Sequence, residues 1–129
     1  MARSTLRSPL GRAIGLGSAK SGAEHWWAQR VSAVALIVLG LWFAAALIAH
    51  AGAEHAAVVA WLKDPISAIL MLLLIAGTFY HAALGLQVVI EDYVHSEWLK
   101  VSSLVAMRLI SMGLAVAGIF AVLRIAFGG

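Results

Sequence analysis

The sequence contains no cysteine and few charged residues. Without cysteine, the chain has no disulfide, thiolate metal site, covalent c-type haem attachment or thiol nucleophile of its own. Charged residues make up only 12% of the 129 residues, whereas 63% are hydrophobic, and this composition is too apolar for an ordinary soluble domain. The formal net charge of +3 comes from sparse basic residues, so we expect no nucleic-acid partner. The low charge and the high hydrophobic content indicate a membrane protein.

Three long uncharged stretches predict the fold. Residues 31–49 and 66–90 contain no Asp, Glu, Lys or Arg, and spanning the hydrocarbon takes roughly 20 residues of helix. Residues 109–123 reach that length only if Arg108 and Arg124 lie at the ends and extend to the headgroups. We therefore predict an all-α membrane protein with three transmembrane helices, at about 27–49, 66–90 and 101–127, in one anchor domain over 27–127.

Basic residues predict the orientation of these helices. The segment before the first helix and the loop after the second carry most of the Lys and Arg, whereas the opposite side has only Lys63 and Arg124. The positive-inside rule thus places the N-terminal tail, residues 1–26, in the cytoplasm. The start of this tail has the composition of a mitochondrial targeting peptide, but we expect a retained tail on a protein of the bacterial inner membrane. The mitochondrial inner membrane is the alternative.

The segments between the three apolar stretches predict two loops. Residues 51–64 form the first loop, and Asp64 before Pro65 is typical of an N-cap followed by a first-turn proline, so the second helix is expected to begin there. The second loop, at about 91–100, is short and contains every acidic residue of the second half of the chain.

His81 lies inside the second uncharged stretch, about 14 Å from its inner end at 1.5 Å per residue, and an ionisable group at that depth needs a partner. Gly77 and Gly85 lie one turn to either side on the same helix face, which leaves a flat trough that fits a planar macrocycle. Alternatively, the glycines let another helix pack closely while His81 hydrogen-bonds across the contact. Spacing alone leaves these interpretations even. A zinc site is less favoured because no second ligand lies one turn away, and a proton relay stays open.

A haem at this histidine needs a second axial ligand. His50 and His55 lie at the outer end, whereas His25 and His95 lie on the cytoplasmic side, so all four are poorly placed and a partner chain is implied. Arg30 begins the first helix on the cytoplasmic side, where it can bind a haem propionate through paired hydrogen bonds. An ordinary interface anchor is the simpler interpretation of this arginine.

Asp92 and Tyr93 lie about 17 to 18 Å beyond His81 if the helix continues, near the inner headgroups. A phenol there can donate a hydrogen bond to a quinone carbonyl, and an adjacent carboxylate can orient it or relay protons. Both residues are equally compatible with a solvated interface, so composition alone leaves the two interpretations balanced.

These residues together resemble the small hydrophobic membrane-anchor subunits of succinate dehydrogenase, respiratory complex II. The strongest part is H-x3-G-L-Q-V-x2-E-D-Y-V-H over residues 81–95. The runs GLGSAKSG, HWW and QRVSA within residues 15–33 look like the alphaproteobacterial branch. With the three-helix plan, the resemblance extends over nearly the whole chain.

The resemblance implies a role for each candidate residue. His81 would be one axial ligand of a b-type haem whose second histidine belongs to the cytochrome b subunit, so that the helices of both chains form a haem-binding bundle. Arg30 would lie near the haem propionates, and Tyr93, with Asp92 beside it, would belong to the ubiquinone site.

The resemblance also implies a complex in which a flavoprotein subunit oxidises succinate and an iron-sulfur subunit passes electrons to ubiquinone. This chain has no flavin fingerprint and no cluster cysteines, so it would be a non-catalytic anchor within an oxidoreductase. The alternatives are a fumarate reductase anchor, a haem-free structural subunit and, less readily, a transporter. The direction of the reaction, the quinone type and the haem potential are not readable from the sequence.

Overall fold

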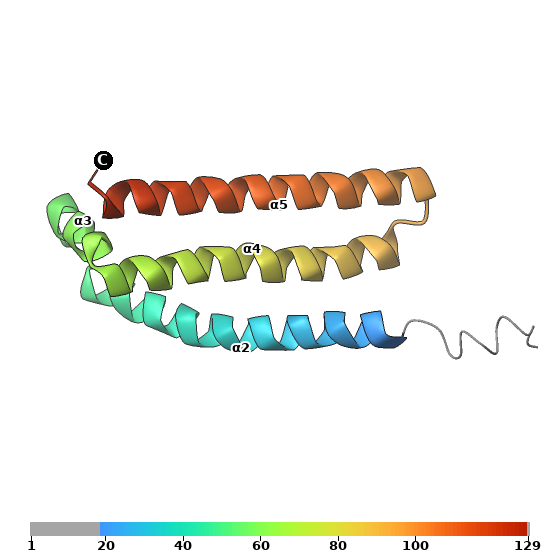
Figure 1. Ribbon diagram of the computed structural model, residues 1–129, viewed down its shortest axis with the longest axis horizontal. Helices are drawn as coiled ribbons and strands as arrows, with labels where there is room; N and C mark the ends of the chain where they lie inside the picture. The colour runs from blue at the N-terminus through green and yellow to red at the C-terminus, as the bar shows by residue number, and fades with distance from the viewer. Residues whose placement is uncertain (1–18, 129) are drawn as a thin grey trace, which may run out of the picture.

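The computed structural model describes the backbone of residues 19–128 and the side chains from residue 22 onward. Within this part of the chain, all the regular elements are helices (Figure 1). In chain order they are α2 (Ala19–Ala49), α3 (His55–Lys63), α4 (Pro65–Tyr93) and α5 (Glu97–Ala126).

Three of these helices have the length and composition of membrane spans, namely Gly22–Ala49, Pro65–Tyr93 and Glu97–Ala126, with 28, 29 and 30 residues. At 1.5 Å per residue each is more than about 40 Å long, which exceeds the roughly 30 Å hydrocarbon core. The prediction of an all-α protein with three transmembrane helices is confirmed.

The helix ends differ from the predicted bounds. The first long helix begins at Ala19 rather than at 27, because the polar stretch before Trp26 contains no proline and continues the helix beyond the apolar part. The predicted tail over 1–26 is therefore helical from Ala19, and the rest of it lies outside the described residues. α4 continues through Tyr93 and α5 already begins at Glu97, so the second loop is shorter than predicted.

The short helix α3 was not predicted, since residues 51–64 were expected to form a loop. Polar residues occur near both ends of this segment, but the sequence between them, AAVVAWL, is apolar and rich in alanine. Alanine and leucine favour helix, and the apolar side chains gain from packing. α3 packs against both α4 and α5.

The start of α4 confirms the predicted cap. The Asp64 carboxylate accepts hydrogen bonds from the Ser67 backbone N–H at 2.9 Å and from the Ser67 hydroxyl at 3.1 Å. Pro65 occupies the first helical position, where its missing N–H costs nothing. These contacts fix the start of α4 directly after the end of α3.

The three long helices lie side by side, with α4 between α2 and α5 and with alternating directions (Figure 1). No Cα atom of α2 lies within 8 Å of one in α5, so the three helices form an open layer rather than a closed bundle. Among the described residues, only four side chains are buried, and they are Ser67, Ala68, Met107 and Val122. Large apolar side chains such as Leu41 and Ile48 are 69% and 77% exposed. The layer thus offers its faces to lipid and to other subunits.

Three aromatic rings close one end of the layer, which we call the tryptophan end and define by Trp42, His50 and Trp61. The Trp42 and Trp61 rings are stacked with centroids 5.8 Å apart, and the His50 ring lies 5.0 Å from that of Trp61. His50 Nδ1 lies 2.9 Å from the Ala46 carbonyl oxygen, within hydrogen-bond distance. The stacked rings therefore hold α3 against the end of α2, and one of their nitrogens, His50 Nδ1, already has a hydrogen-bond partner.

Candidate functional site

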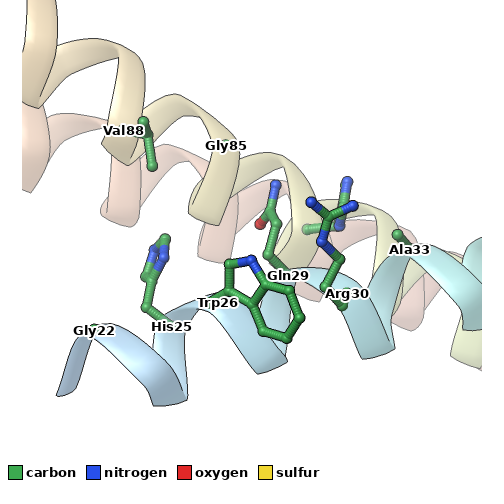
Figure 2. Close-up of a pocket in the computed structure, with 9 residues that line it drawn as sticks. Gly22, His25, Trp26, Gln29, Arg30, Ala33, Gly85 and Val88 are labelled. Carbon is green, nitrogen blue, oxygen red and sulfur yellow. The ribbon is translucent and has the colours of Figure 1, made fainter. Parts of the chain in front are cut away.

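The opposite end of the α2–α4 pair, which we call the histidine end, has an open hollow of about 720 Å³ (Figure 2). Its walls come from the first half of α2 and the second half of α4, and the residues that line it are Gly22, His25, Trp26, Gln29, Arg30, Ala33, His81, Gly85 and Val88. The volume lies within the roughly 300 to 1,000 Å³ typical of ligand and cofactor pockets. The structure thus brings the predicted residues His81 and Arg30 to one site.

The imidazole of His81 is half-buried and held across the helix interface by Ser32 of α2. Ser32 Oγ lies 2.8 Å from His81 Nδ1. The same Oγ lies 2.7 Å from the Ala28 carbonyl oxygen and 3.2 Å from that of Gln29, the usual back-bond of a serine within a helix. Sequence reasoning did not assign Ser32 to the site.

The two glycines beside His81 have different surroundings. A Cβ on Gly77 would lie 3.3 Å from Leu36 Cδ2, which is tight, so this glycine lets α2 and α4 approach closely. A Cβ on Gly85 would lie 3.7 Å from Gln29 Nε2, an ordinary contact, and Gly85 lines the hollow. Gly85 lines this hollow with His81, whereas Gly77 lines a second hollow of about 720 Å³ between the same helices, beside Ser32 and Tyr80. The two glycines therefore do not share one continuous trough.

Two polar atoms at the histidine end are buried without a hydrogen-bond partner in the described part of the chain, namely His25 Nε2 and Gln29 Oε1. An unsatisfied buried polar group costs about 1 to 3 kcal/mol, so native structures pair nearly all of them. Figure 2 shows both side chains projecting from α2 toward α4. A ligand in the hollow could therefore donate to Gln29 Oε1 and exchange a hydrogen bond with His25 Nε2.

His25 and Gln29 are site residues that the prediction missed. His25 was judged poorly placed for a haem ligand, and it lies on α2, two turns before the serine that contacts His81. Its position in the hollow follows from the early start of α2, which makes residues 25, 29 and 32 one stripe along a helix face. This i, i+4, i+7 spacing is the signal in the sequence that identifies the stripe.

Arg30 lies at the edge of this hollow. Its guanidinium carbon lies 5.4 Å from the centre of the Trp26 ring, a cation–π contact. The described residues that line the hollow include no Asp or Glu. The site therefore carries a fixed positive charge that favours an anionic group.

Asp92 and Tyr93 do not line this hollow. They are the last two residues of α4, and Tyr93 is 77% exposed. Asp92 lies one helical turn beyond Val88, which lines the hollow, so the pair is adjacent to the site along the helix but outside it.

Arg108 has a partner on α4. Its Nη2 donates to Gln87 Oε1 at 3.1 Å, and Gln87 Nε2 donates to Glu91 Oε1 at 2.8 Å. The first of these hydrogen bonds joins α5 to α4, and the pair offsets the free-energy cost of an arginine within a membrane helix. Arg108 thus has a packing role that the sequence did not reveal.

The described residues include no group of three or more His, Cys, Asp or Glu side chains that could hold a metal ion. A multidentate protein site such as that of zinc needs three or four such ligands. A metal that arrives within a macrocycle needs only one or two side chains. The chemistry of the hollow, with one histidine beside a glycine and an arginine, fits the second kind of group.

Comparison with known proteins identifies the family. The family model of the succinate dehydrogenase/fumarate reductase transmembrane subunit matches residues 4–123. A succinate dehydrogenase hydrophobic membrane anchor subunit from Rickettsia bellii is 38% identical over 116 residues, which cover 90% of this chain and 93% of the relative. The corresponding subunit of Paracoccus denitrificans is 29% identical over 121 residues, which cover 94% of this chain and 93% of the relative.

A third relative, the succinate dehydrogenase membrane anchor subunit of Reclinomonas americana, is 33% identical over 98 residues, which cover 72% of this chain and 80% of the relative. No solved structure matches the chain. The predicted resemblance, including its alphaproteobacterial character, is confirmed. The chain belongs to the succinate dehydrogenase/fumarate reductase transmembrane subunit family and is a multi-pass membrane anchor of the succinate dehydrogenase type.

Proposed function

We propose that this chain anchors a succinate:ubiquinone oxidoreductase in the bacterial inner membrane and supplies half of a b-type haem site at the histidine end. Family membership implies a complex with other subunits. The proposed partners are a cytochrome b subunit, which donates the second axial histidine, an iron-sulfur subunit and a flavoprotein subunit. The open layer of α2, α4 and α5, with few buried side chains, supports a partner that covers one of its faces.

The observation that carries the haem proposal is the composition of the hollow around His81. A haem supplies four ligands to its iron and, when bound, a one-electron carrier. His81 would provide one axial ligand, and Gly85 leaves room beside it. Arg30 would bind a propionate. The buried His25 Nε2, otherwise without a partner in the described chain, can serve the same anionic groups when it carries a proton.

The quinone proposal rests on the end of α4. The Tyr93 hydroxyl would donate a hydrogen bond to a ubiquinone carbonyl, and the carboxylate of Asp92 would orient the head group or pass a proton. Both side chains are exposed in this chain, so neighbouring subunits would enclose the ring. The pair lies one turn from the hollow, which supports a quinone bound close to the proposed haem.

The haem proposal is tested by a reduced-minus-oxidised spectrum of the gently solubilised complex, with wild type and His81→Ala compared at equal subunit content. We expect a b-type signal in wild type and its loss in the variant. His55→Ala is the matched control, because His55 is exposed at the start of α3 and far from the histidine end along the helices.

Three results would count against the proposal. An assembled wild-type complex without a b-type signal would leave a haem-free structural anchor. A signal that survives in an assembled His81→Ala complex would show that the iron is held elsewhere. A loss of the signal in His55→Ala as well would show that the loss is not specific to His81.

A further inference from the structure

We propose that Ser32 is a positioning residue that determines which nitrogen of His81 is available to a ligand in the hollow. The inference deepens the proposed function and rests on it, since the ligand is taken to be haem iron. Ser32 is the side chain that contacts the His81 ring across the helix interface, with Oγ 2.8 Å from Nδ1. Neither the family description nor the names of the relatives give this residue a role.

The position of the hydrogen between Ser32 and His81 follows from a count of the hydrogens available. A serine hydroxyl has one hydrogen to donate, whereas a backbone carbonyl can only accept. Ser32 Oγ lies 2.7 Å from the Ala28 carbonyl oxygen, a distance at which two oxygens without a hydrogen between them repel. The hydroxyl hydrogen therefore points to this carbonyl, and the Oγ lone pairs are what Ser32 offers to His81. Nδ1 must then carry the hydrogen of the contact at 2.8 Å.

The tautomer follows directly from this count. A neutral imidazole has one N–H and one lone pair, so a hydrogen on Nδ1 leaves the lone pair on Nε2. Nε2 is then the atom that can bind a metal. A ligand histidine whose other nitrogen donates to an oxygen has a fixed ring orientation and a more basic lone pair. Because Ser32 donates its own hydrogen bond to the Ala28 carbonyl oxygen, the backbone of α2 determines the orientation of the His81 ring on α4.

The test compares Ser32→Ala with a matched serine elsewhere in the chain, in the intact purified complex. Ser102 makes the same back-bonds, to the Trp98 carbonyl oxygen at 2.9 Å and to that of Leu99 at 3.1 Å, but its hydrogen bonds within the described chain include no histidine. We expect Ser32→Ala to speed the transfer of haem to apomyoglobin about 10- to 100-fold, the usual effect of removing such a partner. The haem potential should also become more positive, because the ligand donates less charge. Ser102→Ala should change neither quantity.

A conservative variant separates positioning from packing. Ser32→Thr keeps a hydroxyl that can form the same back-bond, so it should restore haem retention and potential to near wild-type values. If Ser32→Ala retains haem at the wild-type potential while His81→Ala loses it, the Ser32 inference is wrong and the proposed function stands. If His81→Ala also retains haem, the proposed function itself is wrong.

A measurement on the wild-type complex does not depend on whether any variant assembles. The complex is prepared with histidine labelled by ¹⁵N at the ε2 position alone, and pulsed EPR of the oxidised haem measures the nitrogens bound to iron. We expect both axial nitrogens to show the label's coupling. A second sample, in which only this chain carries the label, assigns the coupling to His81, and an absence of the label's coupling in that sample would contradict the tautomer assigned to His81.

Discussion

The tryptophan end and the histidine end of the α2–α4 pair differ in how they satisfy their polar groups. At the tryptophan end, His50 packs against Trp61 and its Nδ1 lies 2.9 Å from a carbonyl oxygen of the same helix. At the histidine end, His25 Nε2 and Gln29 Oε1 are buried without a partner among the described residues. Both ends combine histidine with tryptophan, so composition does not distinguish them.

This difference shows which end of the α2–α4 pair satisfies its buried polar groups without another molecule. At the tryptophan end, no buried side-chain polar atom among the described residues lacks a partner, so that end needs no other molecule to satisfy one. The histidine end leaves at least about 1 to 3 kcal/mol uncompensated for each unpaired buried group. A molecule that supplies the missing partners recovers this free energy, which favours a binding site over a packing defect as the interpretation of the hollow.

Filling the hollow is the change with the largest expected effect. Gly85→Leu places a branched side chain where a Cβ alone would already lie 3.7 Å from Gln29 Nε2, so we expect haem content to fall to background in the assembled complex. Gly113→Leu is the matched control, since a Cβ at Gly113 meets nothing within 4 Å. Haem and subunit content are measured together. Normal haem content in Gly85→Leu would show that the cofactor does not use this hollow.

Removing the positive charge from the histidine end should have the next largest effect. Arg30→Gln loses charge-assisted hydrogen bonds to a propionate, which are worth about 1.5 to 3 kcal/mol, so haem release should be about 10- to 100-fold faster. Arg124→Gln, at the far end of α5, should leave the release rate unchanged. If Arg30 served only to stack on Trp26, the variant would lower the melting temperature without changing haem release.

Disrupting the tryptophan end should produce the opposite pattern. Trp61→Ala removes two aromatic contacts, with Trp42 and His50, each worth about 0.5 to 1.5 kcal/mol. We expect a lower melting temperature of the complex with unchanged haem per assembled complex. Trp98→Ala, at a side chain that is 82% exposed, should change the melting temperature much less. Loss of haem from Trp61→Ala would mean that the two ends are coupled rather than independent.

The smallest effect is expected at the cap of α4. Asp64→Ala removes the acceptor of the Ser67 backbone N–H, which typically costs about 1 kcal/mol. Asp64→Asn should retain most of the stability because asparagine caps helices equally well. Hydrogen exchange in the first turn of α4 should rise in the alanine variant alone, and equal exchange in both variants would show that the cap is not needed there.

The sequence was sufficient for the parts of this structure that depend on apolar length and local chemistry. Uncharged stretches predicted the three spans, and the adjacent Asp64 and Pro65 predicted the start of α4. His81 and Arg30 were placed on the same side of the membrane by counting residues, and they share the hollow. The spans and the cap could be predicted because each depends on the sequence of one helix, whereas the roles proposed for His81 and Arg30 stay predictions.

The parts that the sequence did not predict depend on how two helices pack. The contact between Ser32 and His81 requires the register of α2 against α4, and the different roles of Gly77 and Gly85 depend on whether Leu36 or the hollow faces them. A single sequence does not contain that register. His25 was missed for another reason, because the first helix was predicted to begin at 27, which left this residue on the tail.

The most direct test of the account is a structure of the native complex by electron cryo-microscopy, with attention to the histidine end. The proposed function predicts haem density in the hollow, with His81 Nε2 on the iron, a histidine of a partner subunit on the opposite side and Arg30 at a propionate. Density for lipid or for apolar partner side chains in the hollow, with His81 hydrogen-bonded across a helix contact, would contradict it.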